Sequence, residues 1–262
     1  MKLNIYQIDA FTSQLFSGNP AAVVPLENWL PDEVLQNIAA ENNLAETAFV
    51  VTSGGGHRIR WFTPTVEVPF CGHATLASAA VLMKYVDADR NRVVFQSASG
   101  ELTVERRDEH YLMNFPARRV SPVQSDDELS RILGAEPIEL HSDNLNNYVA
   151  VMEHAGVVRA LTPDLTAMAR LARIGVIVTA RGDNGYDIVS RYFAPAKGIP
   201  EDPVTGGAHC ALTPFWTARL NRQELRAYQA SRRGGEMICR MVGDRVELQA
   251  SAVFYLEGEI EF

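Results

Sequence analysis

Residues 60–64 read Arg-Trp-Phe-Thr-Pro, and residues 191–195 read Arg-Tyr-Phe-Ala-Pro, half a chain length further on. Each copy leads into a turn of small residues that opens an apolar stretch. These turns are Cys-Gly-His-Ala at 71–74 and Thr-Gly-Gly-Ala at 205–208. Internal similarity over such a long offset predicts that the two halves of the chain fold alike.

A further pair of segments supports this repeat. Residues 95–98 read Phe-Gln-Ser-Ala, and residues 228–231 read Tyr-Gln-Ala-Ser. The segments keep their order in both halves, and their spacing drifts by only a few residues, as insertions in loops would cause. The repeat therefore predicts two pseudo-symmetric lobes with a functional site in the cleft between them.

The composition narrows the class of protein. The 262 residues are 47% hydrophobic and 21% charged, which is enough apolar material for two cores. A net charge of −8 without a long basic run argues against nucleic acid or an anionic membrane as a partner. No segment resembles a signal peptide or a membrane span, so we expect a cytoplasmic protein. Three cysteines without Cys-x-x-Cys spacing predict neither disulfides nor a structural metal site.

The pattern along the chain predicts an α+β fold. Residues 72–85 are apolar or small on every side, which is typical of a buried helix. A matching helix begins at Gly206, and Pro214 is expected to end or kink it early. The surrounding β-rich runs are joined by hairpin signals such as Ser-Gly-Gly-Gly at 53–56, so a parallel doubly wound sheet is disfavoured. Each lobe is predicted to be a buried helix surrounded by mostly antiparallel strands.

The domain boundaries follow from this pattern. The N-terminal lobe is predicted to cover residues 1–117 and the C-terminal lobe residues 118–251. A final strand at 252–262 is able to pack back onto the first lobe.

Both buried helices start with glycine-rich turns. Helix starts leave several backbone N–H groups unpaired and carry partial positive charge, so they are ready sites for an anion. The turns at 72–75 and 206–209 are therefore candidate binding sites for one carboxylate, through Gly72, His73, Gly206, Gly207 and Ala208. The alternative is that these glycines only allow close packing of the helices.

Three side chains are candidates for the chemistry. The repeat places residues 45–50 over residues 174–179, so Glu46 replaces a glycine at the start of a buried strand. Because a buried carboxylate is costly without a partner, Glu46 is a candidate general acid or base, although a solvated strand end is also possible. Asp202 precedes the second glycine turn and either caps that turn or faces Glu46. His73 and His209 lie at helix starts, which disfavour imidazolium, so both are expected to be neutral.

At this point a family resemblance emerges. Residues 43–50, 69–75 and 201–210, together with the N-terminal segment 9–21, resemble the phenazine-biosynthesis (PhzF-like) isomerase family. The resemblance covers nearly the whole chain. That family is grouped with diaminopimelate epimerases and proline racemases, so it implies two similar lobes, each a barrel-like sheet around a central helix. It also implies a homodimer.

The resemblance also implies a mechanism. Epimerases of this fold use two opposed cysteines, but here Cys71 occupies the first position and Thr205 the second. A threonine hydroxyl is too weakly acidic to replace a thiol without an activating base. The resemblance instead implies a cofactor-independent isomerase of a small carboxylate substrate, in which Glu46 carries the proton and His73 and Asp202 assist.

The sequence is also compatible with two other functions. One is an amino-acid racemase or epimerase that uses Cys71 against Asp202 or Glu46. The other is a carboxylate-binding protein without catalysis. The motifs bind only a carboxylate, so they do not select one substrate.

Overall fold

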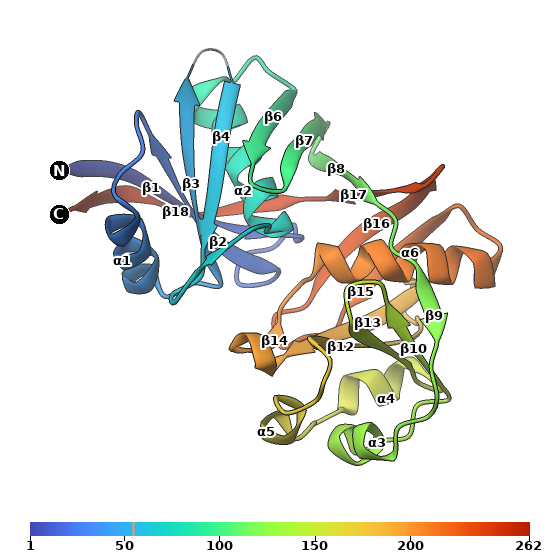
Figure 1. Cartoon of the computed structure of the whole chain (residues 1–262). Coiled ribbons are helices and arrows are strands. Elements are labelled where there is room, and N and C mark those ends of the chain that lie inside the picture. The colour runs from blue at the N-terminus through green and yellow to red at the C-terminus, as the bar shows by residue number, and fades with distance from the viewer. Residues whose placement is uncertain (54–55) are drawn as a thin grey trace. The chain divides into compact units, whose positions relative to one another are not determined.

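The computed structural model describes residues 1–53 and 56–262, which divide into two compact units (Figure 1). Unit 1 contains Met1–Asn114 and Gln249–Phe262, and unit 2 contains Phe115–Leu248. Strands dominate both units, which confirms the α+β class. Among the described residues, no helix is long and apolar enough to cross a membrane.

Unit 1 is a mixed sheet with two principal helices. Its strands pair in the order β18-β1-β2-β3-β4-β6-β7-β8, and the β2–β3 and β4–β6 pairs are parallel while the others are antiparallel. The elements are β1 (Lys2–Ala10), β2 (Asn19–Leu26), α1 (Asp32–Asn42), β3 (Glu46–Ser53), β4 (Gly56–Phe62), β5 (Glu67–Val68), α2 (Gly72–Val81) with a π-helical turn (Leu82–Val86), β6 (Arg92–Ser97), β7 (Gly100–Arg107), β8 (His110–Pro116) and β18 (Ala252–Glu261).

Helix α2 is the buried helix that the sequence predicts. Every residue after Gly72 is buried, because α2 lies against β1, β2 and β3. Helix α1 packs in a separate apolar cluster with alternate residues of β2, such as Ala22 and Val24. Successive strand residues point to opposite faces, so Ala21 and Val23 lie on the other face. The central strands are thus covered on both sides.

The two strands of the hairpin predicted around residues 53–56 are present. β3 and β4 pair antiparallel up to Ser53 opposite Gly56. The remaining two glycines of the predicted turn, Gly54 and Gly55, lie outside the described residues.

Unit 2 repeats the pairing pattern of unit 1. The directions along β10-β11-β12-β13-β15-β16 match those along β1-β2-β3-β4-β6-β7, with parallel β11–β12 and β13–β15 pairs. The elements are β9 (Val120–Pro122), α3 (Asp127–Leu133), β10 (Glu139–Asp143), β11 (Asn147–Val151), α4 (Ala155–Ala160), α5 (Leu165–Met168), β12 (Gly175–Arg181), β13 (Ile188–Ala194), a 3₁₀ turn (Pro195–Lys197), β14 (Ile199–Asp202), α6 (Gly206–Leu220), β15 (Glu224–Gln229), β16 (Gly235–Val242) and β17 (Arg245–Ala250).

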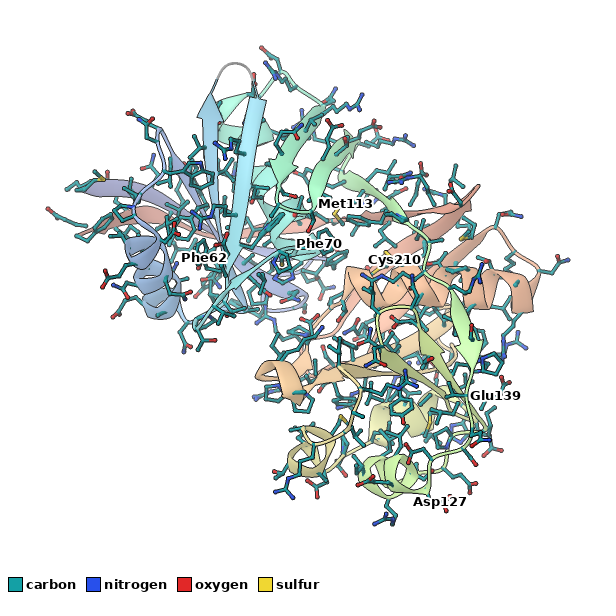
Figure 2. The ribbon with its side chains drawn as sticks, in the orientation of Figure 1. Phe62, Phe70, Met113, Asp127, Glu139 and Cys210 are labelled. Atoms are coloured by element: carbon teal, nitrogen blue, oxygen red, sulfur yellow. The ribbon has the colours of Figure 1, made fainter. Side chains whose placement is uncertain are left out.

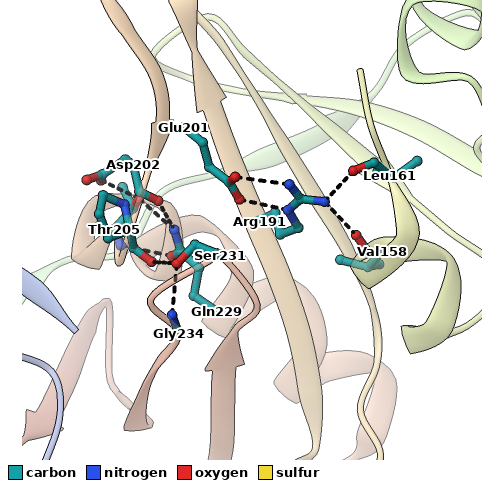
Figure 3. A network of polar contacts seen from close by, with 10 residues as sticks. Val158, Leu161, Arg191, Glu201, Asp202, Thr205, Gln229, Ser231 and Gly234 are labelled. Carbon is teal, nitrogen blue, oxygen red and sulfur yellow. Dashed lines mark hydrogen bonds and ion pairs between the residues drawn. The ribbon is translucent and has the colours of Figure 1, made fainter. Parts of the chain in front are cut away.

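The repeated arginine has the same role in both units. Arg60 holds Glu67 with two hydrogen bonds of 2.7 Å. Arg191 holds Glu201 in the same way, at 2.7 and 3.0 Å (Figure 3). Each guanidinium also lies over the ring of the phenylalanine two residues further on, at 5.1 Å in unit 1 and 4.7 Å in unit 2. Fork-shaped pairing of this kind requires arginine, which explains why the motif recurs.

Helix α6 does not end at Pro214, so the expectation that this proline ends the helix early is wrong. The helix runs on to Leu220 with Pro214 inside it. Proline lacks the N–H that would bond to the carbonyl four residues earlier, at Cys210. That carbonyl instead accepts the backbone N–H of Arg118 at 2.9 Å, so the lost donor is replaced from outside the helix. Figure 2 labels Cys210 at this point on α6.

Candidate functional site

Three buried side chains meet in unit 1. Glu46 is the first residue of β3, Cys71 immediately precedes α2, and His73 lies in the first turn of α2. His73 Nε2 lies 3.0 Å from Glu46 Oε2, and His73 Nδ1 lies 3.4 Å from Cys71 Sγ. One atom from each residue falls within 4.8 Å of the other two. The structure therefore brings together Glu46 and His73, two of the three predicted catalytic residues.

The strand register puts Glu46 in this place. Glu46 lies opposite Ala21 where the parallel β2–β3 pair begins, and Gly175 lies opposite Asn147 where the parallel β11–β12 pair begins. The repeat alignment of Glu46 with Gly175 is thus confirmed. A Cβ at Gly175 would lie 2.5 Å from the hydroxyl of Tyr192, so unit 2 has no room for a side chain there.

Glu46 is nearly enclosed. Its side chain is 10% exposed, and Oε2 lies at ion-pair distance from His73 Nε2. Within the described part of the chain, Oε2 nevertheless makes no aligned hydrogen bond. A buried polar atom without a hydrogen bond is costly, so its presence calls for an explanation. A carboxylate oxygen without an aligned hydrogen bond is free to take up a proton.

Within the cluster of Glu46, Cys71 and His73, the pKa values of the cysteine and the histidine are both shifted. Burial, and then the carboxylate of Glu46, raise the pKa of the Cys71 thiol to about 11, so Cys71 is neutral at pH 7. Burial lowers the pKa of His73, but the acidic groups of Cys71 and Glu46 outweigh burial and raise it well above 6.5. The prediction that the helix start keeps His73 neutral is therefore wrong: the neighbouring acidic groups of Cys71 and Glu46 outweigh the helix start.

The starts of α2 and α6 are uncapped. Within the described residues, no side chain caps either helix, and neither has an acid in its first turn. By contrast, side-chain oxygens of Asp126 and Asp164 cap α3 and α5. The uncapped starts keep their partial positive charge and their N–H groups. Gly72, His73, Gly206, Gly207 and Ala208 thus lie at the helix starts where the sequence predicts them.

Asp202 belongs to a polar network in unit 2. The hydroxyl of Thr205 donates to Asp202 Oδ2 at 2.5 Å (Figure 3). The buried Gln229 accepts the N–H of Thr205 at 2.8 Å and donates to the backbone carbonyl of Asp202 at 2.8 Å. Gln229 thereby fixes the turn before α6, a role that the sequence pattern does not predict. Thr205, which replaces the second cysteine, is therefore hydrogen-bonded to a carboxylate.

His209 is a neutral packing residue. It is fully buried, its Nδ1 lies 2.9 Å from the carbonyl of Thr205, and its Nε2 lies 3.4 Å from Ser190 Oγ. Burial lowers the pKa of His209 to about 4, which confirms the expectation that this histidine is neutral.

Arg118 adds a positive charge near the start of α6. Its guanidinium lies so close to Gly207 that a Cβ at Gly207 would be 3.3 Å from Nη2. The nearest acid, Asp143, is 3.9 Å away and already accepts hydrogen bonds from the backbone and side chain of Asn147. Sequence reasoning missed Arg118, because its position depends on the carbonyl that Pro214 leaves free at Cys210.

The chain matches the family model described as phenazine biosynthesis-like protein over residues 8–258. An uncharacterized isomerase of Pseudomonas aeruginosa is 51% identical over 260 residues, which cover 99% of each chain. A phenazine biosynthesis-like domain-containing protein of Mus musculus is 38% identical over 286 aligned residues, again covering 99% of each chain.

Solved structures agree with these relatives. A PhzF-family protein of Enterococcus faecalis is 42% identical with a TM-score of 0.97, and each chain is covered completely. A putative PhzC/PhzF protein of Clostridium difficile is 37% identical with a TM-score of 0.94, covering 99% of this chain and 100% of that one. A probable proline racemase of Agrobacterium radiobacter shares only the fold, at 11% identity and a TM-score of 0.66, covering 99% and 92%. The chain belongs to the phenazine biosynthesis-like protein family, as an isomerase-type enzyme.

Proposed function

We propose that the chain catalyses a cofactor-independent proton shift on a small carboxylate substrate, with Glu46 as the acid/base group. The observation that carries this proposal is Glu46 Oε2, which is buried, lies 3.0 Å from His73 Nε2 and makes no aligned hydrogen bond among the described residues. General acid/base groups need an oxygen that is both shielded from water and free to accept a proton. Glu46 meets both conditions.

The proposed reaction has two steps. Glu46 removes a proton from a substrate carbon next to a C=C bond, and the electron pair of the broken C–H bond forms a new C=C bond while the pair of the old one moves to its far carbon. Glu46 then returns the proton to that far carbon, which regenerates the Glu46 carboxylate. The imidazolium of His73 assists, because it stabilises the ionised form of Glu46 before the first step and is a nearby proton donor after it.

The helix starts are proposed to bind the substrate's negative charge. Backbone N–H groups of Gly72 and His73, at the uncapped start of α2, are suited to the carboxylate and to charge that develops on it. The uncapped start of α6, at Gly206 and Gly207, offers a second set of donors in unit 2, whereas the N–H of Ala208 already donates to the carbonyl of Thr205 at 3.1 Å. Asp202 lies before this second start, and we propose that it orients a polar group of the substrate.

Two observations support glutamate chemistry over a thiol racemase. The pKa of Cys71 is raised to about 11, so little thiolate forms at neutral pH. The second cysteine of such a mechanism is replaced by Thr205, whose hydroxyl donates to Asp202. We therefore expect a Cys71→Ala variant to keep turnover, whereas a racemase that uses Cys71 would lose it.

The proposal is tested with Glu46→Gln, which keeps the shape of the side chain and removes the base. A panel of cyclic and amino carboxylates is first screened for binding by calorimetry, and turnover of each bound compound is then measured. We expect near-complete loss of turnover with binding retained, while Glu201→Gln, a control that removes a carboxylate from the Arg191 pair, keeps both. Retained turnover in Glu46→Gln would reject the mechanism, and binding without turnover in the wild type would favour a carboxylate-binding protein.

A further inference from the structure

The thiol of Cys71 has no part in the proposed reaction, yet it lies beside the reacting groups. Its Sγ is 3.4 Å from His73 Nδ1 and 3.9 Å from His73 Nε2. The third member, Glu46 Oε2, is 3.0 Å from the same Nε2 and has an unused acceptor position within the described residues. Sulfur, nitrogen and oxygen donors thus converge on one buried point.

These separations suit a tetrahedral ion. Zinc bonds are about 2.3 Å to sulfur, about 2.0–2.1 Å to imidazole nitrogen and about 2.0–2.2 Å to carboxylate oxygen, so neighbouring donors in a tetrahedral site lie roughly 3.3–3.6 Å apart. The Nε2–Oε2 and Nε2–Sγ distances of 3.0 and 3.9 Å bracket that range. The separation between Cys71 Sγ and Glu46 Oε2 lies within 4.8 Å, so this pair would need to close by about 1.2 Å at most to bind the ion.

We propose that Glu46, Cys71 and His73 form a three-ligand site for Zn²⁺ or a similar borderline-soft divalent cation, and that an ion bound there blocks the base. The formation of the site stands on its own, while the blocking rests on the proposed function of Glu46. On binding, the Cys71 S–H bond breaks, its proton passes to solvent, and the sulfur electron pair forms the bond to the ion. His73 likewise releases its Nε2 proton to solvent.

The donor set favours zinc over harder ions. Mg²⁺ and Ca²⁺ require several oxygen ligands, whereas one thiolate, one imidazole and one carboxylate are typical of zinc. One thiolate and one carboxylate also neutralise the two charges of the ion, as a buried site requires. Three protein ligands leave a fourth position open to water or to a carboxylate.

The spacing of cysteine and histidine in the sequence predicts no such site. The other adjacent histidine and cysteine, His209 and Cys210, are engaged within α6 by the carbonyls of Thr205 and Gly206. The missing ligand is Glu46, which β3 brings to the start of α2 from 25 residues before Cys71.

The test uses the full-length protein after treatment with a chelator. Co²⁺ is titrated as a spectroscopic probe, and Zn²⁺ is then added in competition. We expect one ion per chain, with a thiolate-to-cobalt charge-transfer band that Zn²⁺ abolishes. Cys71→Ser should lose the band and bind at least about 10-fold more weakly, because loss of a ligand should cost no less than loss of an outer-shell partner. Cys239→Ser, which removes another buried thiol, is the matched control and should behave as the wild type.

Several outcomes would overturn the inference. These are less than one ion per chain, a band that Cys71→Ser leaves unchanged, or a band lost in Cys239→Ser. If Cys71→Ser does not fold, Glu46→Gln is tested in its place. This variant should keep the charge-transfer band but bind Co²⁺ more weakly, and an unchanged affinity for Co²⁺ would count against the site. Inhibition by the bound ion is measured as the exchange of substrate protons with solvent, first in the presence of Zn²⁺ and then after EDTA has removed the ion. Exchange that persists when every site holds Zn²⁺ would refute the inhibition. Exchange measured in EDTA alone tests the proposed function separately.

Discussion

Replacement of Glu46 by glutamine should change how the stability of the chain depends on pH. In the wild type, the pKa of His73 is raised well above 6.5 by the neighbouring acidic groups, although burial opposes this. In Glu46→Gln the charge of Glu46 is gone, and Cys71 is a neutral thiol below about pH 11. Burial then dominates, so we expect the pKa of His73 to fall below 6.5.

The sign of the effect follows from proton linkage. In the wild type, His73 contributes stability that is fully present below pH 6.5 and is lost as the pH rises toward its folded-state pKa. In the variant, the unfolded chain binds a proton that the folded chain does not, so stability is lost as the pH falls below 6.5. Each case changes the folding equilibrium by at most about tenfold per pH unit, so the stability advantage of the wild type over the variant should shrink steadily from pH 5 to pH 8.

The assay is urea unfolding, followed by tryptophan fluorescence, at several values from pH 5 to pH 8. The control is Glu201→Gln, which breaks an ion pair with Arg191. Since arginine stays charged throughout this range, the difference between this control and the wild type should not vary with pH. A constant difference between Glu46→Gln and the wild type, or one that grows as the pH rises, would refute this account of His73.

Three further predictions concern stability. Gly175→Ala places a Cβ 2.5 Å from the hydroxyl of Tyr192, so overpacking should cost about 1–3 kcal/mol, whereas Gly72→Ala, whose Cβ meets only one atom at 3.8 Å, should change the urea midpoint far less. Leu76→Ala empties a fully buried position in α2 and should cost about 2–5 kcal/mol in the same assay. His209 titrates at about 4 in the folded chain and near 6.5 when unfolded, so wild-type stability should fall as the pH drops from 6.5 toward 4. His209→Gln should weaken that pH dependence, and an unchanged slope would contradict the burial of a neutral imidazole.

Most of the fold could be predicted from the sequence, because the repeat and the apolar pattern are local signals. The segments that begin at Arg60 and Arg191 recur because each arginine holds a glutamate and covers a phenylalanine. The all-apolar stretch after Gly72 predicts a buried helix, and the structure covers that helix with strands. The position of Glu46 was also predictable, since the repeat aligns it with Gly175 at the start of an equivalent strand.

The features that were missed depend on contacts between distant segments. The pKa of His73 is raised by the acidic groups of Cys71 and of Glu46, and Glu46 lies 27 residues earlier in the chain. The continuation of α6 through Pro214 depends on a hydrogen bond from Arg118. The closure of the turn before α6 depends on Gln229, which the pattern places on a strand without a role. Local propensity carries no information on such pairs.

The measurement that tests the central claim most directly is incorporation of deuterium from D₂O into a carboxylate substrate, followed by mass spectrometry. Wild type, Glu46→Gln and Cys71→Ala are compared side by side over the same panel of cyclic and amino carboxylates, in EDTA. If Glu46 carries the proton, wild type and Cys71→Ala should exchange substrate protons with solvent and Glu46→Gln should not. Exchange that survives in Glu46→Gln, or that disappears in Cys71→Ala, would contradict the account.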